Sequence, residues 1–213
     1  MALVKSILFI DGENLAMRYQ ALLESGRKPK PTVVHIPDIF VWQPGLGPGV
    51  INTDILRVNY YTSMVGDDDA IASVKESISA QRYFSHGDYY GQCQLFPRVY
   101  KKLKKSTKSR LVDINITIDV MRHAYTHAVD VVYLFSGDGD FVHLVEEVAR
   151  SGKKVCVGAF SSGLEPRLRV AADRFALLDE HFFEPITAPV APEVTPNEVL
   201  PATPAVVEGK SDA

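Results

Sequence analysis

The chain has 213 residues, of which 46% are hydrophobic, and a formal net charge of −3 at pH 7. This length and apolar content predict a single α/β domain with a sizeable core, and they exclude a chain that is disordered throughout. The charge is unevenly spread, because the segment 98–110 holds seven basic residues and no acidic one. A basic segment on an otherwise acidic protein indicates one surface that faces a polyanion.

The N-terminus and the two cysteines indicate a reducing compartment. The run MALVKSILFID ends in a carboxylate with no small-residue cleavage site, so it predicts a first strand and not a signal peptide. No apolar run approaches the roughly 20 residues of a membrane helix. Cys93 and Cys156 lie in strand-like apolar runs and are predicted to be buried free thiols, although a bridge between them stays open. We therefore expect a cytoplasmic protein with no membrane partner.

Short apolar segments alternate with helical patterns along the chain. Strands are predicted at 6–11, 57–65, 92–99, 129–136, 153–160 and 175–178. Helices are predicted at 14–25, 69–84, 113–126, 141–151 and 165–172. The strands SILFI and VVYLF are almost continuously apolar, as in a sheet that helices cover on both faces. The alternation predicts a doubly wound α/β fold with a mainly parallel sheet of five or six strands.

Two stretches depart from this alternation. Residues 27–52 carry five prolines and three glycines, and we expect an elaborated loop over one edge of the fold, with room for a short strand at 33–36. From Pro185 onward the sequence has no aromatic residue, so residues 185–213 are predicted to be a disordered tail. The folded domain is therefore expected to span residues 1–184.

Acidic residues follow two of the predicted strands. Asp11 ends the first strand, and Asp138 and Asp140 follow the strand at 129–136. Ligands of parallel α/β sheets bind outside the carboxyl ends of the strands, so these three acids are expected to converge. Like charges repel unless a cation neutralises them, and a set of hard oxygen ligands suits Mg²⁺ or Mn²⁺ better than Zn²⁺.

Further polar residues stand near these acids. Asn14 is expected to be a helix N-cap or to face the same crevice, whereas Glu13 is expected to point elsewhere. Asp113 is interpreted equally as an N-cap or as a ligand. Asp119 lies between two apolar residues, where an unpaired charge would be costly, and a metal ion would supply the partner. Ser136 is expected to hydrogen-bond a ligating carboxylate or to cap the next helix.

The basic segment directly precedes the helix that carries Asp113 and Asp119. Charge runs are usually solvated loops, but beside an acidic metal site such a run can hold the phosphates of a nucleic acid. The residues expected to do so are Lys101, Lys102, Lys104, Lys105, Lys108 and Arg110. Tyr100 lies nearby and could stack on an unpaired base, although such aromatic residues are more often part of a core. His123 and His127 follow Asp119 at helical spacing and are more often surface residues than metal ligands.

Three segments together resemble a known family. ILFIDGEN, VDINITIDVMRHA and DVVYLFSGDGDFVHLVEEVARSGKKVCVGAF are similar to the NYN domain, in the LabA-like branch of the PIN-like nuclease superfamily. The resemblance spans about residues 4–184 and implies a three-layer PIN-like fold and a metal-dependent ribonuclease acting on RNA. It places the essential acids on Asp11, Asp119 and Asp138, and supporting roles on Asn14, Asp113, Ser136 and Asp140. The preference for RNA over DNA rests on this resemblance alone.

The resulting hypothesis is that one or two divalent ions, held by Asp11, Asp119 and Asp138, activate water for in-line attack on an RNA phosphodiester. A Toprim-like phosphotransfer enzyme is an alternative, but Toprim begins with Glu where this chain has Asp11. Haloacid dehalogenase phosphatases need an aspartate at position 13, which is Glu13 here. A catalytically inactive regulator that binds RNA or protein also stays open, as do the cleavage mode and a homodimer.

Overall fold

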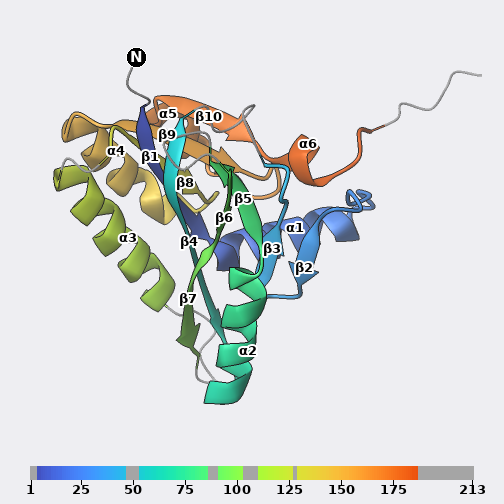
Figure 1. Ribbon diagram of the computed structural model, residues 1–213. Helices are drawn as coiled ribbons and strands as arrows, with labels where there is room; N and C mark the ends of the chain where they lie inside the picture. Colours follow the sequence, from blue (N-terminus) through green and yellow to red (C-terminus); the bar gives the residue numbers. More distant parts are fainter. Residues whose placement is uncertain (1–3, 47–52, 86–90, 103–109, 127–128, 187–213) are drawn as a thin grey trace, which may run out of the picture.

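A six-stranded parallel sheet forms the centre of the computed structural model, which describes residues 4–46, 53–85, 91–102, 110–126 and 129–186. The strand order is β10-β9-β8-β1-β4-β7, and each neighbouring pair is parallel (Figure 1). The strands are β1 (Lys5–Asp11), β4 (Asp54–Met64), β7 (Phe96–Lys101), β8 (Val131–Phe135), β9 (Lys154–Ala159) and β10 (Arg174–Leu177). This arrangement confirms the predicted parallel sheet, with β1 near its middle.

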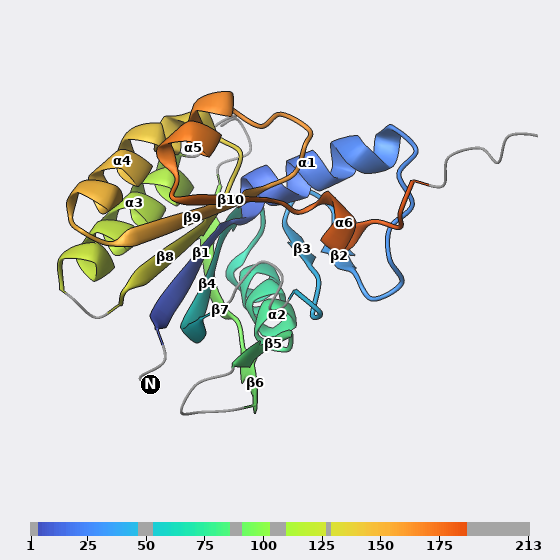
Figure 2. The same ribbon diagram turned by 90° about the horizontal axis from the view of Figure 1, so that it is seen from above.

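Helices cover both faces of the sheet. They are α1 (Gly12–Glu24), α2 (Asp68–Ser79), α3 (Arg110–Tyr125), α4 (Val142–Arg150), α5 (Pro166–Ala171) and α6 (Asp179–Phe182), with a 3₁₀ turn η1 (Gly139–Phe141) before α4. Figure 2 shows α3 and α4 on one side of the sheet and α1 and α2 on the other. None of the helices in the described ranges is both long enough and apolar enough to cross a membrane.

Strand β1 shows why the central strands are apolar throughout. Leu8 and Ile10 belong to the core on the side of α1 and α2, whereas Ile7 and Phe9 belong to the core under α3 and α4. All four side chains are buried, because successive residues of a strand point to opposite faces. The sheet therefore separates two hydrophobic cores.

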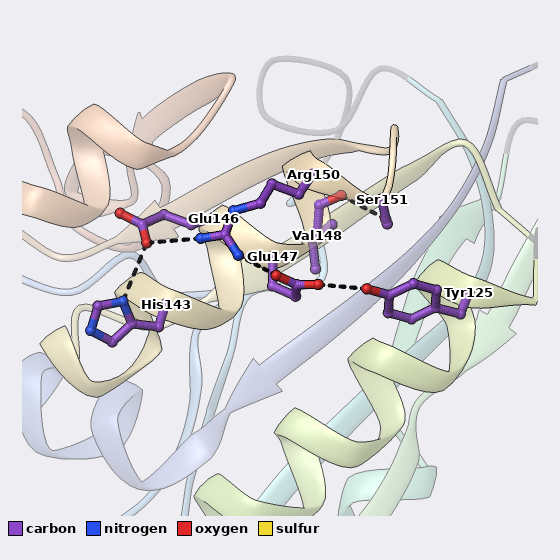
Figure 3. A network of polar contacts seen from close by, with 7 residues as sticks. All are labelled: Tyr125, His143, Glu146, Glu147, Val148, Arg150 and Ser151. Carbon is purple, nitrogen blue, oxygen red and sulfur yellow. Dashed lines mark hydrogen bonds and ion pairs between the residues drawn. The ribbon is translucent and has the colours of Figure 1, made fainter.

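A polar network joins α3 to α4 on the outer side of the helical layer (Figure 3). The Tyr125 hydroxyl at the end of α3 donates to Glu147 of α4 at 2.5 Å, and Arg150 bonds both Glu147 and Glu146. His143 completes the network with a 3.2 Å contact to Glu146. The network is exposed to solvent, so each of its contacts contributes little to stability.

The predicted helix at 69–84 is too long, because α2 ends at Ser79. Residues Arg82–Ser85 instead form strand β5, which pairs antiparallel with β6 (Gly91–Gln94). Tyr83 is buried, and the Trp42 indole donates to the Arg82 carbonyl at 2.9 Å, so tertiary contacts favour the extended conformation here.

The predicted strand at 92–99 is in fact two strands. Its first part is β6 of the small hairpin, and its second part is β7 of the central sheet. Leu95 separates them, with a fully buried side chain and an N–H that donates to the Gln81 carbonyl. The chain therefore changes sheets at one buried residue, which an unbroken apolar pattern cannot indicate.

The proline-rich stretch is more ordered than the predicted loop. It forms a hairpin of β2 (Val34–Ile36) and β3 (Phe40–Trp42), and the three side chains of β3 are buried in the core. Its last residues, 47–52, lie outside the described residues, as does the predicted tail from residue 187 onward. Both cysteines are free, but only Cys156 is buried; Cys93 is half-buried, contrary to prediction.

Candidate active site

A cavity of about 670 Å³ opens at the carboxyl edge of the sheet. Its acidic wall contains Asp11 from the end of β1, Asp113 from α3 and Asp138 from the turn after β8. Met17 and Ile39 also line the cavity and contribute apolar surface. Three elements that are distant in sequence thus place carboxylates on one cavity.

Asp11 occupies the floor of this cavity and is 2% exposed. Its Oδ1 accepts the Asn14 N–H at 3.1 Å, which makes Asp11 the N-cap of α1, and its Oδ2 accepts the Ser136 hydroxyl at 2.8 Å. Burial raises the pKa of Asp11 to about 7, and the hydrogen bonds from Asn14 and Ser136 oppose this rise. A buried carboxylate of this kind favours a proton or a cation beside it.

Gly12 allows the chain to turn from β1 into α1 at this point. A Cβ atom there would lie 2.2 Å from the Tyr60 ring and 2.6 Å from the backbone oxygen of Tyr61. Any side chain would therefore push α1 away from β4. The glycine keeps the start of α1, and with it Asn14, against the end of the sheet.

The turn after β8 is tied to the turn after β1. The Gly137 N–H donates to Asn14 Oδ1 at 3.0 Å, and the Asp138 N–H donates to Ser136 Oγ at 3.1 Å. Asn14 is therefore not the N-cap that we considered, because Asp11 has that role and the Asn14 side chain links the two turns. Asp138 Oδ1 accepts the N–H of Asp140, whose own side chain is exposed and does not line the cavity.

The two aspartates of α3 lie in different places. Asp113 lies in the first turn of the helix, which begins at Arg110, so it is not an N-cap, and it lines the cavity. Asp119 does not line the cavity: its Oδ2 accepts the Tyr61 hydroxyl at 2.8 Å and its Oδ1 accepts Arg122 at 2.8 Å. The structure thus brings Asp11, Asp113 and Asp138 together and leaves Asp119 to a separate contact with β4.

Glu13 faces the cavity, contrary to the expectation that it points elsewhere. Its Oε1 accepts the Ser63 hydroxyl from β4 and lies 3.7 Å from Lys102 Nζ. Sequence reasoning overlooked Ser63 completely, because nothing in β4 marks it as different from other strand residues. Lys102 was expected to bind substrate, and it is the basic residue that lines the described part of the cavity.

Of the other members of the predicted basic surface, the two that the structure describes do not line the cavity. Lys101 bonds the exposed Asp68 at 2.9 Å, and Arg110 is exposed at the start of α3. Lys104, Lys105 and Lys108 lie outside the described residues, as does His127. His123 is half-buried beside Phe9, and burial lowers its pKa.

The donor set of the cavity suits a hard divalent cation. Within the described ranges, no three acidic, histidine or cysteine side chains are grouped so that they could hold one ion together. Mg²⁺ usually keeps several water ligands and takes only one or two carboxylates from the protein, so a tight triad is not required. The oxygen donors of the cavity would therefore fit Mg²⁺ or Mn²⁺.

Comparisons with known proteins bear on the fold and the family of the chain. The crystal structure of a protein of unknown function from Vibrio parahaemolyticus has a similar fold, with a TM-score of 0.56 and 19% sequence identity. The similarity covers 85% of this chain and 96% of that one, and it shows the fold alone. No curated protein matches the chain.

The model of the NYN domain matches residues 5–179, from the first residue of β1 to the first residue of α6. The NYN domain is a domain of the PIN-like nuclease superfamily. The parallel sheet with helices on both faces is consistent with a PIN-like fold. Since the match covers the whole sheet and every element around the cavity, the chain belongs to the NYN domain family.

Proposed function

We propose that the protein is a metal-dependent ribonuclease whose active site is the cavity lined by Asp11, Asp113 and Asp138. The observation that carries this proposal is the excess of negative charge there: five carboxylates and one lysine line the described part of the wall. Carboxylates that face a common space repel one another, and this cost is offset when a cation binds among them. Such an arrangement is typical of a site built for a divalent ion.

Each acid has its own role in this proposal. Asp113 and Asp138, which are less buried than Asp11, would hold the ion, and Asp11 would contribute its charge from the cavity floor. This proposal does not include Asp119 among the metal ligands, because Tyr61 and Arg122 bind its carboxylate. When bound, Mg²⁺ or Mn²⁺ would polarise the scissile phosphate and make water a stronger nucleophile.

The other side chains of the cavity position these groups. Asn14 and Ser136 hold the two turns together, so that the acids keep their places when a charged substrate enters. Lys102 would hold a phosphate oxygen, since its ammonium lies beside the cavity with Glu13 as its described ion partner. The roles of Lys104, Lys105, Lys108 and Arg110 in holding flanking phosphates stay a prediction.

The choice of RNA as substrate is supported by family membership, because the NYN domain belongs to the PIN-like nucleases. The LabA-like branch is part of the same proposal and is supported by the motifs ILFIDGEN and SGDGDF. In the structure, these motifs are the β1–α1 turn and the turn after β8, the two tied segments of the cavity.

The proposal is tested by incubating labelled single-stranded and structured RNAs with the full chain in Mg²⁺, Mn²⁺ or EDTA. We expect metal-dependent cleavage that Asp138→Asn abolishes. Glu147→Gln, in the exposed network of Figure 3, is the matched control and should cleave at the wild-type rate. Circular dichroism of each variant shows that the fold is intact. Full activity of Asp138→Asn would overturn the site, and RNA binding without cleavage under any condition would favour a regulatory module.

A further inference from the structure

Strand β7 carries a second feature that the cavity does not explain. Phe96, Arg98 and Tyr100 lie at alternate positions of β7, so their side chains share the face of the sheet on the α3 side, and Lys102 follows at the same spacing just beyond the end of the strand. This aromatic–basic alternation, which we call the β7 strip, lies on a strand that ends the sheet (Figure 1). Phe96 is 38% exposed, Arg98 is exposed, and Tyr100 and Lys102 are half-buried.

The neighbouring strand extends the strip. Asn59 and Tyr61 of β4 are paired in register with Phe96 and Arg98, and Arg57 precedes them on the same face. The Arg57 guanidinium lies over the Phe96 ring, 4.3 Å from its centroid. An exposed phenylalanine with a stacked guanidinium is a flat surface whose components both stack well on nucleobases.

In the described part of the chain the arginines of the strip form no close ion pair, and the nearby Asp119 carboxylate is bound by Tyr61 and Arg122. Among the described residues, neither Arg57 nor Arg98 has an ion pair within 4.0 Å, whereas Lys101, on the opposite face of β7, is paired with Asp68. One face of this edge strand is therefore neutralised within the protein. The other face keeps positive charge that a polyanion can neutralise.

The strip leads directly to the proposed active site. Lys102, its last member, lines the cavity and lies 3.7 Å from Glu13. Two residues of a strand advance about 6.6 Å, a step similar to the spacing of successive phosphates in an extended single strand. The repeat of the strip and its end point thus match a nucleic acid chain that runs along β7 into the cavity.

We infer that the β7 strip binds the single-stranded RNA that flanks the scissile phosphate. Phe96 and Tyr100 stack on bases, Arg57 and Arg98 contact phosphates, and Lys102 delivers the chain to the carboxylates. This inference rests on the proposed function, whose site it extends. An added protein strand suits this edge less well, because Pro97 has no N–H to offer to a further strand.

The test is RNA binding by the full chain in EDTA, which separates binding from cleavage. The probe is a fluorescein-labelled, unstructured RNA of about 12 nucleotides, long enough to span one such site, followed by anisotropy. Phe96→Leu keeps an apolar side chain without a ring and should weaken binding about tenfold, whereas Phe96→Tyr should restore it. Arg98→Gln should weaken binding several-fold and reduce the slope of log affinity against log salt by about one.

Arg174→Gln is the matched control, because Arg174 is also an exposed arginine on an edge strand, at the opposite end of the sheet. It should bind RNA as the wild type does. Wild-type affinity of Phe96→Leu and Arg98→Gln would overturn the strip, even if the enzyme cleaves RNA. Equal loss in Arg174→Gln would also overturn it, because the effect would then be one of general charge. The inference would also be overturned if an RNA duplex bound as tightly as the single strand.

The two proposals fail separately. If strip variants lose RNA binding but wild type shows no metal-dependent cleavage, the strip stands and the nuclease assignment fails. If wild type cleaves RNA and the strip variants bind it unchanged, the nuclease assignment stands and the RNA takes another path.

Discussion

Two regions of this protein concentrate charge, and they do so in opposite ways. In the network between α3 and α4, Arg150 lies between Glu146 and Glu147, and the groups are exposed (Figure 3). In the cavity, five carboxylates face one lysine, and Asp11 is almost completely buried. The first region pairs its acids with its own basic groups, and water weakens these contacts. In the second, the described lining residues include one lysine for five carboxylates, so a bound cation would offset the remaining negative charge.

The largest effect on cleavage should come from replacing one acid of α3, Asp113, and not the other, Asp119. Asp113→Asn should reduce metal-dependent cleavage on the order of 10³-fold, because Asp113 lines the cavity and would contact the ion. Asp119→Asn should stay within about threefold of wild type, since its carboxylate is bound by Tyr61 and Arg122. Initial rates on one labelled RNA measure both. Equal losses in the two variants would show that Asp119 serves the site after all.

A smaller effect should appear in stability at Asp11. Its pKa in the folded protein, about 7, is above the ordinary aspartate value of 3.8, so between these pH values the folded state holds a proton that the unfolded state releases. Stability without metal should therefore fall as pH rises from about 4 to 7. Asp11→Asn should remove this dependence and be more stable at pH 8 in EDTA, by on the order of 2 kcal/mol.

Urea unfolding of wild type and Asp11→Asn at several pH values measures this difference. Asp173→Asn is the control. It replaces an acid that the Lys154 ammonium binds at 2.8 Å, so it should not stabilise the protein. A wild-type stability that rises between pH 4 and 7, with no gain in Asp11→Asn, would contradict the prediction.

The smallest effect should come from the α3–α4 network. Glu147→Gln removes the charge that Arg150 contacts but keeps an oxygen for the Tyr125 hydroxyl. We expect only a small loss of stability, because exposed ion pairs contribute little. Thermal unfolding at low and high salt measures it, and the difference between variant and wild type should shrink at high salt. A loss of several kcal/mol would show that the network is a structural support comparable to a core contact.

The sheet could be predicted from sequence because its signal is local. Strands such as β1 and β8 are apolar on both faces, and each is followed by a turn or a helix start that shows in the sequence. The sequence predicted a helix at 69–84, but Arg82–Ser85 form strand β5. This could not be predicted, because the contact that stabilises the strand comes from Trp42. The same is true of the hairpin β2–β3, whose burial depends on α1 and β4.

Only some of the acids of the site could be placed from the sequence. Asp11 and Asp138 follow from strand ends, a rule that needs no knowledge of packing. Asp113 and Asp119 are six residues apart on one helix, which places them roughly 120° apart around its axis. Both therefore cannot face the same cavity directly, and only the packing of α3 on β4 shows which one does. Glu13 was misjudged for the same reason, because its partners, Ser63 and Lys102, lie on other strands or beyond them.

The hydroxyl of Ser136 serves two acids at once, since it donates to Asp11 and accepts from the backbone of Asp138. Ile10 of β1 is paired with Phe135 of β8, so Asp11 and Ser136 are the next positions along the same ladder. The width of the cavity floor is therefore set by the alignment of two strands and not by their turns. A slip of one residue between these strands would turn Ser136 to the opposite face of the sheet and separate the two acids in a single step.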